Sequence, residues 1–392
     1  MRQSRKKWER RREVHRNKLA AVIFVIMMIA FCVVNLATGD REFSATENRA
    51  LEQRPELTIS GIESGRWMEQ YESYVSDQFA GRDFWVVLKS RVDLLAGKRK
   101  ANGVFKGKDH YLLEDIAKPD EDQLKENLSA MKKFQKQYKD IPMYMMLVPN
   151  AANIESDKLP GYAVTENQEK QFKAIHSTLG SVYTWVDVSD ILKKHRSEEI
   201  YYHTDHHWTT LGAYYGYQAL SKSMKLDTSK TSDMKPYAVT NAFNGTLAST
   251  SGYETGYEEP IYIYAPDNLK NATEVVVNNV NEKKKTATLY DTSKLKGKDK
   301  YALFLGGNYP ILDIKTTADS TDKLLIIKDS YANSLIPFLI PYYREIVVVD
   351  PRYYYDDIEK VMKKDKITSV LFLYNGNTFV KDNSISGVLQ ND

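Results

Sequence analysis

The sequence has very little cysteine: Cys32 is the only one among 392 residues. It lies inside a long uncharged segment, so the remainder of the chain can form no disulfide bond and must be stabilised by packing alone. A cysteine nucleophile is excluded for the same reason. Any covalent chemistry outside that segment would therefore use serine or threonine.

An excess of positive charge is also absent from most of the chain. The protein has 55 Lys and Arg against 52 Asp and Glu, but nine of the basic residues and two of the acidic ones lie in residues 1–18. The rest holds 46 basic and 50 acidic residues, a net charge of about −4. Nothing in this balance indicates nucleic-acid binding. The sequence also has no internal repeat and no low-complexity block.

The one long hydrophobic run is residues 19–37, "LAAVIFVIMMIAFCVVNLA", which carries no charge. As a helix it would span about 28 Å, close to the thickness of a bilayer core. The basic tail, residues 1–18, places the N-terminus in the cytoplasm and the main domain outside. A cleaved signal peptide is the alternative, but the run is long for one and offers no good cleavage site. We expect one uncleaved transmembrane helix. A large external domain without cysteine is typical of a bacterium.

Beyond the helix we expect a polar stalk over residues 38–64 and one extracytoplasmic domain over 65–392. Residues 65–97 and 120–139 show helical spacing of apolar side chains, and "NGVFKGKDHYLLED" predicts a short hairpin between them. Four short apolar runs follow, separated by helical stretches: "PMYMMLVPN", "KLLIIKDS", "EIVVVDPR" and "SVLFLYNG". This pattern predicts an α/β fold with a mostly parallel sheet. Residues 235–310 are rich in Tyr, Thr and Val with turn signals, and predict an inserted antiparallel β region.

The most unusual stretch is "YYHTDHHWTT", residues 201–210, which holds three of the seven histidines. The cluster His203, Asp205, His206 and His207 could ligate a metal. The histidines could instead pack and hydrogen-bond within a tight turn. In a third interpretation, Asp205 orients His207 as a general base on an extended loop, before a helix that begins near Thr209.

A base of this kind needs a nucleophile, and "KLLIIKDSYANSLIPFLI" offers Ser330. Ser330 follows a predicted buried strand and precedes a helix predicted through residues 335–340. A hydroxyl at such a bend lies at the carboxyl edge of the sheet, where the following backbone N–H groups could stabilise an oxyanion. The alternative is that Asp329 or Ser330 only caps the helix.

A family resemblance is carried by "YHTDHHWTTLGAYYGY", together with "NGVFKGKDHYLLE", "MLVPNAANIESDKLP" and "LLIIKDSYANSLIPFL". These segments resemble the DHHW proteins of Gram-positive bacteria, which are similar to the SGNH-hydrolase-like domains of alginate O-acetyltransferase proteins. The resemblance covers most of the external domain. It implies an SGNH-hydrolase-like, flavodoxin-like α/β fold.

Carried over by motif, the resemblance implies that Asp205, His207 and Ser330 form a catalytic triad. Asn308, in "FLGGNYP", would be an oxyanion donor on the strand before the serine, and Arg352 a ligand contact. Further candidates for contacts with substrate are Tyr331, Trp208 and His206. The order Asp, His, Ser differs from ordinary SGNH hydrolases and fits the alginate-type arrangement. The lack of a Gly-Asp-Ser-Leu block puts lipase-type activity in doubt.

The resemblance also implies acyl transfer to an exported cell-envelope polysaccharide. The partner that supplies the acyl group would be a membrane-bound O-acyltransferase, and we expect neither a cofactor nor a metal. Two other functions stay open: a non-catalytic glycan-binding or assembly protein of the envelope, and a metal-dependent hydrolase that uses the histidine cluster.

The topology can be tested with protease on intact, wall-stripped cells. We expect the protease to remove the external domain and to spare a tag at residue 1, because the basic tail is retained inside. Immunoblotting for the two ends of the chain gives the readout, with detergent-permeabilised cells as the control. A protected external domain would overturn both the orientation and the proposed envelope role.

Overall fold

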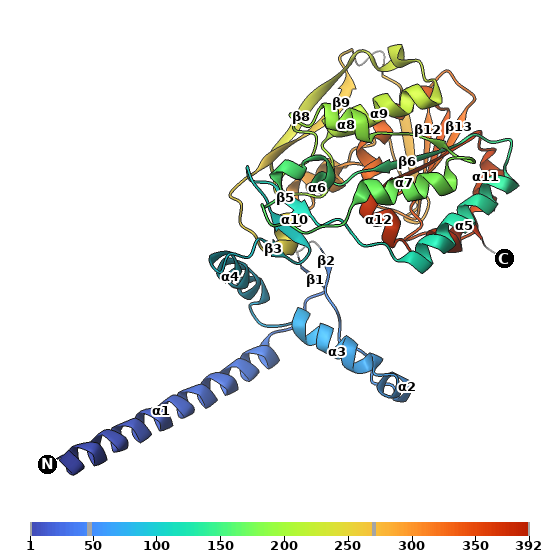
Figure 1. The fold of residues 1–392 in the computed structure, drawn as a ribbon. Coiled ribbons are helices and arrows are strands. Elements are labelled where there is room, and N and C mark those ends of the chain that lie inside the picture. The colour runs from blue at the N-terminus through green and yellow to red at the C-terminus, as the bar shows by residue number, and fades with distance from the viewer. Residues whose placement is uncertain (1, 45–48, 269–271, 391–392) are drawn as a thin grey trace. The chain divides into compact units, whose positions relative to one another are not determined.

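The structure is a computed structural model in which residues 2–44, 49–268 and 272–390 are described. The chain divides into two compact units, residues 1–89 and 90–392, with the boundary inside one helix. The strands and helices of the second unit form the α/β part of the molecule (Figure 1).

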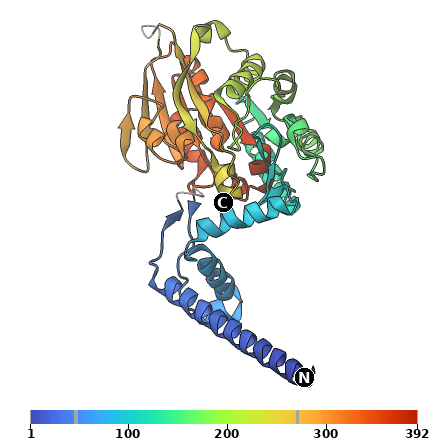
Figure 2. The ribbon, with the colours of Figure 1, turned by 90° about the vertical axis from the view of Figure 1, so that its left-hand side faces the viewer.

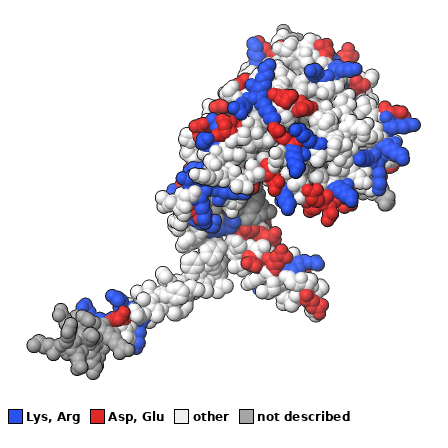
Figure 3. Space-filling model, in the orientation of Figure 1, with Lys and Arg blue, Asp and Glu red and all other residues white. Residues whose placement is uncertain are grey.

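The first unit is mainly helical. Its elements are α1 (Arg2–Ala37), β1 (Phe43–Ser44), β2 (Arg49–Ala50), α2 (Ile59–Glu63), α3 (Arg66–Asp77) and the first half of α4 (Arg82–Leu95). From Arg12 on, α1 is the one described helix long and apolar enough to cross a membrane, by length and composition. Its apolar stretch carries no charged side chain on the face shown in Figure 3. The expected N-terminal apolar helix is therefore present.

The second unit holds the remaining elements. Its strands are β3 (Lys100–Ala101), β4 (Val104–Lys106), β5 (Leu112–Glu114), β6 (Met143–Val148), β7 (Thr184–Trp185), β8 (Met234–Phe243), β9 (Glu259–Pro266), β10 (Val275–Asn279), β11 (Lys284–Thr286), β12 (Ile311–Thr316), β13 (Lys323–Lys328), β14 (Glu345–Val349) and β15 (Ser369–Asn375). Its α-helices are α5 (Glu121–Gln137), α6 (Ala151–Ile154), α7 (Gln168–Leu179), α8 (Ser189–Lys194), α9 (Thr210–Met224), α10 (Thr246–Ser251), α11 (Ile358–Asp365), α12 (Gly376–Lys381) and α13 (Ile385–Leu389). Short 3-10 helices are η1 (Ser156–Lys158), η2 (Thr228–Thr231), η4 (Thr292–Lys296), η5 (Lys300–Leu303), η6 (Ser330–Ser334) and η7 (Ile336–Tyr342).

The main sheet has eight strands in the order β11-β10-β12-β14-β13-β15-β6-β7. Strands β14, β13, β15, β6 and β7 run parallel, while β12, β10 and β11 continue the sheet in antiparallel pairing. The four predicted apolar runs form β6, β13, β14 and β15. The predicted α/β fold with a mostly parallel sheet is thus confirmed.

The central strands contain continuous apolar runs because both faces of the sheet are covered. In β13, Leu324 and Ile326 enter the core on one face, and Leu325 and Ile327 the core on the other. Helices α6, α8 and α9 with η6 and η7 cover the first face, while α5, α7, α11, α12 and α13 cover the second. Figures 1 and 2 show this layering around the sheet.

The predicted β-rich region, residues 235–310, is built from two separate parts. Strands β8 and β9 form their own antiparallel pair, whereas β10 and β11 extend the main sheet. The prediction that 304–310 forms a strand is wrong. Leu305, Gly306 and Gly307 have positive φ angles of 61°, 81° and 121°, so the chain turns there. The helix expected after Ser330 is present only as the 3-10 turns η6 and η7, with Pro341 inside η7.

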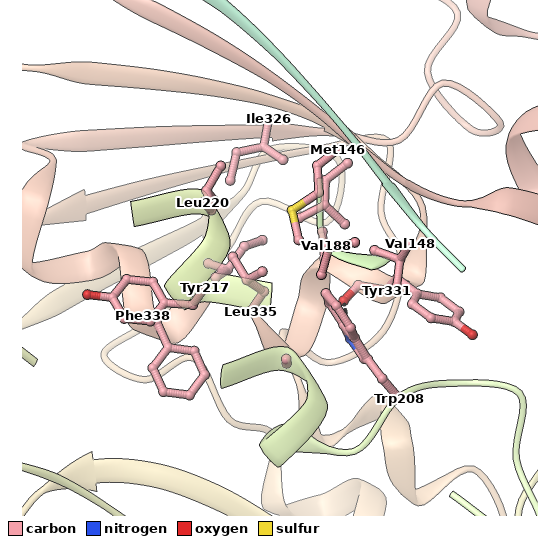
Figure 4. Packing of buried hydrophobic residues seen from close by; sticks show 14 of the residues in the cluster. Met146, Val148, Val188, Trp208, Tyr217, Leu220, Ile326, Tyr331, Leu335 and Phe338 are labelled. Atoms are coloured by element: carbon pink, nitrogen blue, oxygen red, sulfur yellow. Dashed lines mark hydrogen bonds between the residues drawn. The ribbon is translucent and has the colours of Figure 1, made fainter. Parts of the chain in front are cut away.

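Helix α9 lies close to Trp208 because Gly216 has no side chain (Figure 4). A Cβ atom at Gly216 would lie 2.7 Å from two atoms of the indole ring and 3.1 Å from the Met146 methyl group. The core layer shown in Figure 4, with Met146, Trp208 and Leu335, leaves no room for that atom.

We therefore expect Gly216→Ala to lower the free energy of unfolding by about 1–3 kcal/mol through overpacking. Urea unfolding of the full-length protein in detergent measures the change. Gly387→Ala, in α13, is the control, because a Cβ there meets nothing within 4 Å. It should be neutral or stabilising by up to about 1 kcal/mol. Equal effects of both substitutions would contradict this account of the packing.

Candidate functional site

The segment 201–208, called here the DHHW loop, is a closed loop between α8 and α9. A β-bridge joins Tyr201 and Trp208, and Tyr202 N donates to the His207 carbonyl at 3.2 Å. Thr209 then caps α9, its side chain accepting from Gly212 N. The loop is therefore held at both ends, and its histidines project from a rigid frame. His203 and His207 are four residues apart, but the loop is not helical, so this spacing does not place them on one helix face.

Trp208 fixes this loop to the turn that holds Ser330. Its indole N–H donates to the Tyr331 carbonyl at 3.0 Å and to Ser334 Oγ at 3.1 Å. The indole is fully buried, beside Tyr331 in Figure 4. In this structure the indole positions the two segments that carry the site, and a contact of Trp208 with substrate stays a prediction.

Ser330 follows β13 at the carboxyl edge of the sheet, and its hydroxyl does not cap the helical turn that follows. Asp329 is the cap: its Oδ1 accepts from Tyr331 N at 2.9 Å, and its Oδ2 accepts from Asn375 N at 2.9 Å. Ala332 N also donates to the Asp329 carbonyl. The backbone N–H groups that follow Ser330 are thus engaged, so they cannot serve as the oxyanion donors expected from the sequence.

The structure brings together Asp205, His207 and Ser330. His207 Nε2 lies 2.7 Å from Ser330 Oγ, although 123 residues separate them in the chain. His207 Nδ1 lies 2.6 Å from Asp205 Oδ1. With Nδ1–H donating to the carboxylate, Nε2 is left to accept the serine proton.

Asp205 is a buried carboxylate whose two oxygens are both satisfied. Its Oδ1 also accepts from His207 N at 3.0 Å, and its Oδ2 accepts from Thr246 N at 2.8 Å and Thr246 Oγ1 at 2.9 Å. Burial alone would raise the pKa of Asp205, but His206, His207 and these hydrogen bonds hold it well below its usual range. The group is therefore ionised and fixed.

Several site residues from the β-rich region had no signal in the sequence. The Tyr301 ring stacks on His207 with 3.7 Å between centroids, and its hydroxyl donates to Ser334 Oγ at 3.0 Å. Glu259 accepts from the N–H groups of His203 and Thr204. Tyr301 and Glu259 belong to no sequence motif and show no regular spacing that would mark them as site residues. They reach the site only because β9 and η5 fold back over the DHHW loop.

His206 lies beside His207 with its side chain 30% exposed. Thr246 has one hydroxyl proton, which it donates to Asp205, so its oxygen accepts from His206 Nδ1 at 2.8 Å. Burial, and then the charge of His207, lowers the pKa of His206. The neutral ring therefore presents Nε2 as a hydrogen-bond acceptor.

The remaining residues predicted from the sequence are Tyr331, Asn308 and Arg352, and each is bound to other residues of the protein. Tyr331 is 1% exposed, and its hydroxyl donates to the His206 carbonyl, so it supports the loop. Asn308 Oδ1 accepts from Lys328 Nζ at 2.7 Å. Arg352 makes a two-pronged pair with Asp350 at 2.8 and 2.6 Å. Their roles toward a ligand stay predictions.

The donor atoms of Asp205, His206 and His207 lie within 4.8 Å of one another, the one group of three or more such residues in the described chain with metal-ligand geometry. Both Asp205 oxygens, however, already accept hydrogen bonds, two each. His207 Nε2 points to Ser330. A metal would have to displace these contacts, so the residues fit an acid–base site better than a metal site.

The DHHW protein family matches residues 129–349, more than half of the chain, and the protein belongs to this family. A crystal structure of a DHHW family protein from Eubacterium siraeum is similar, with 24% identity, 75% of this chain and 98% of that one covered, and a TM-score of 0.61. Bacillus cereus PatB1, solved with a sulfonyl adduct, has 20% identity, coverage of 73% and 99%, and a TM-score of 0.60. At this identity the likeness extends to the fold alone. No curated protein matches the chain.

The ionised state of Asp205 makes a pH-dependent contribution to stability. Its pKa in the folded protein is below the ordinary value of 3.8, so the contribution is complete above about pH 5 and is lost as pH falls toward the folded pKa. The stability gap between the wild type and Asp205→Asn, measured by urea unfolding, should narrow by about 1 kcal/mol from pH 7 to pH 3. An unchanged gap would contradict the assignment of a depressed pKa.

Proposed function

We propose that the protein is a membrane-anchored serine acyltransferase or acetylesterase that modifies an exported polysaccharide through an acyl-enzyme on Ser330. The observation that carries the proposal is the 2.7 Å contact between His207 Nε2 and Ser330 Oγ. The 2.6 Å contact between His207 Nδ1 and Asp205 extends it. A serine hydroxyl is a weak nucleophile until a base takes its proton, and this arrangement supplies both the base and the group that orients it.

In the first half-reaction, Ser330 Oγ attacks the carbonyl carbon of an acetyl ester, and its proton passes to His207 Nε2. The Asp205 carboxylate stabilises the resulting imidazolium. When the tetrahedral intermediate collapses, the bond to the donor oxygen breaks and that oxygen takes the proton from His207. Acetyl-Ser330 remains.

In the second half-reaction, a sugar hydroxyl or water attacks acetyl-Ser330, with His207 now taking the proton of the attacking group. Collapse of this intermediate releases the acetylated sugar or acetate, and Ser330 Oγ recovers its proton from His207. Both products come from one acyl-enzyme, so transfer and hydrolysis differ only in which acceptor reaches it.

The oxyanion of both intermediates needs hydrogen-bond donors. The N–H groups of Tyr331 and Ala332 are engaged by Asp329. Two groups remain available among the described hydrogen bonds: the N–H of Ser330 itself and the Asn308 amide, whose oxygen is bound by Lys328 and Asn333. We assign the oxyanion to these two donors.

Helix α1 would hold the enzyme at the outer face of the membrane, with the basic tail in the cytoplasm. A soluble acetyl donor would have to be exported. A membrane-bound O-acyltransferase that passes acetyl groups across the bilayer would supply the acyl group where the anchored domain works. The acceptor is then a polysaccharide of the cell envelope.

Two other functions are distinguished by experiment. The observation that supports a metal-dependent hydrolase is that the donor atoms of Asp205, His206 and His207 lie within 4.8 Å of one another. A non-catalytic glycan-binding protein would share the fold without needing the contact between His207 and Ser330.

We expect full-length protein in detergent to release acetate from 4-nitrophenyl acetate. Ser330→Ala and His207→Ala should each lose activity on the order of a thousandfold, and the double variant should be little worse, because the residues act as a unit. Asp205→Asn should lose a similar amount or somewhat less.

The controls separate the alternatives. His206→Ala should be milder than His207→Ala, because its ring makes no contact with Ser330 in the described structure. Chelator should leave the rate unchanged. Loss of activity with chelator would establish the metal-dependent hydrolase instead. Full activity in Ser330→Ala would eliminate the serine mechanism.

A further inference from the structure

A second carboxyl group, Glu114, is held at the site by contacts that the proposed mechanism does not use. It is the last residue of β5, and its Oε2 accepts two amide hydrogen bonds, from Asn150 Nδ2 at 2.8 Å and Asn377 Nδ2 at 2.9 Å. Its Oε1 accepts no hydrogen bond from the described residues and keeps some solvent-accessible surface. One oxygen is thus bound twice, and the other has no hydrogen-bond partner among the described residues.

The position of Glu114 follows from its neighbours. Asn150 comes just after β6 and Asn377 just after β15, so the carboxyl lies over the carboxyl ends of these two strands. Strand β15 is the neighbour of β13, which leads to Ser330. Asn375 N donates to Asp329 Oδ2, which joins this corner to the serine turn.

Strand β5 is also tied to the DHHW loop, since Leu112 N donates to the His203 carbonyl at 2.7 Å. Glu114 therefore stands between the loop and the serine turn. Burial raises the pKa of Glu114, and a positive charge on the nearby His206 would oppose this rise. The two side chains thus interact across the site.

The support around Glu114 is rigid. Gln168 Nε2 donates to Asn150 Oδ1 at 2.6 Å, and Ala117 N donates to Asn377 Oδ1 at 2.8 Å. Both amides therefore have fixed orientations and present their N–H groups to Glu114. Holding Asn150 and Asn377 needs only Oε2. A purely structural role leaves the orientation of Oε1 unexplained.

We propose that Glu114 Oε1, together with His206 Nε2, accepts hydrogen bonds from hydroxyl groups of the acceptor sugar and so favours transfer over hydrolysis. Both atoms are acceptors, and sugars present neighbouring hydroxyls as donors. A second hydroxyl bound here would hold the sugar while another hydroxyl attacks acetyl-Ser330. Water cannot span both positions in the same way. This inference rests on the proposed function, since it needs the acyl-enzyme.

Glu114→Gln is a sharp test because the local amides fix its orientation. Asn150 and Asn377 both donate toward the position of Oε2, so the glutamine carbonyl must take that place. Its NH₂ group then replaces Oε1. The substitution exchanges an acceptor for a donor without a change of shape or loss of the two amide bonds.

The measurement is a competition in one tube between two alcohols for the same acyl-enzyme. Full-length protein in detergent is given 4-nitrophenyl acetate with equal glycerol and 1-propanol, which have the same carbon number. The ratio of acetyl-glycerol to acetyl-propanol is compared with the ratio from imidazole-catalysed acetylation without enzyme. Because both products come from one intermediate, the ratio does not depend on the total rate or on the folded fraction.

We expect the wild type to exceed the reference ratio by about tenfold, the effect of one hydrogen bond. Glu114→Gln should return to the reference ratio. Glu155→Gln is the matched control: Glu155 is a buried carboxyl at 1% exposure near α6, enclosed rather than open to the site, and its ratio should equal that of the wild type. If Glu114→Gln does not fold, Glu114→Asp, which withdraws the carboxyl by one methylene, should give the same loss.

A wild-type ratio equal to the reference, or a Glu114→Gln ratio equal to the wild type, would overturn the inference while leaving the proposed function intact. A failure of the proposed function looks different. In that case the wild type forms neither ester, or Ser330→Ala forms both as fast as the wild type.

Discussion

The geometry of the candidate site depends on one buried indole that joins its two segments. The Trp208 indole donates to Tyr331 O and Ser334 Oγ, and so joins the loop that carries His207 to the turn that carries Ser330. A displacement of about 1 Å between a base and its nucleophile can cost on the order of a hundredfold in rate. The close approach of α9 at Gly216 keeps the indole in place. Core packing and catalytic geometry are therefore one constraint here.

The β-rich region has a role beyond covering the sheet. It supplies three residues of the site. Thr246 binds Asp205, Glu259 holds the DHHW loop, and Tyr301 stacks on His207. The contacts of Thr246 and Glu259 satisfy polar groups that would otherwise be buried without a partner. The α/β frame thus places Ser330, the proposed nucleophile, while the antiparallel additions orient His207 and Asp205, its proposed base and carboxylate.

Much of the fold could be predicted because its signals are local. The apolar runs of β6, β13, β14 and β15 are continuous since both faces of each strand are buried. The proximity of Asp205, His207 and Ser330 could be predicted from a short motif, a bend expected after a strand and the family resemblance, and the structure brings the three side chains together.

What could not be predicted depends on contacts distant in the chain. Tyr301 and Thr246 reach the site through the return of η5 and α10, for which the sequence has no periodic signal. The strand expected around Asn308 fails because Gly306 and Gly307 adopt positive φ angles. The structural contacts of Trp208 could not be predicted because its place in the motif does not reveal that it is fully buried.

The most direct test of the central claim is to trap the acyl-enzyme. Full-length protein mixed with an activated acetyl ester is quenched in acid, digested and mapped by mass spectrometry. We expect one acetyl group per chain on the peptide that contains Ser330, and none in Ser330→Ala. Turnover without any acetylated peptide, or with the acetyl group on another residue, would contradict it.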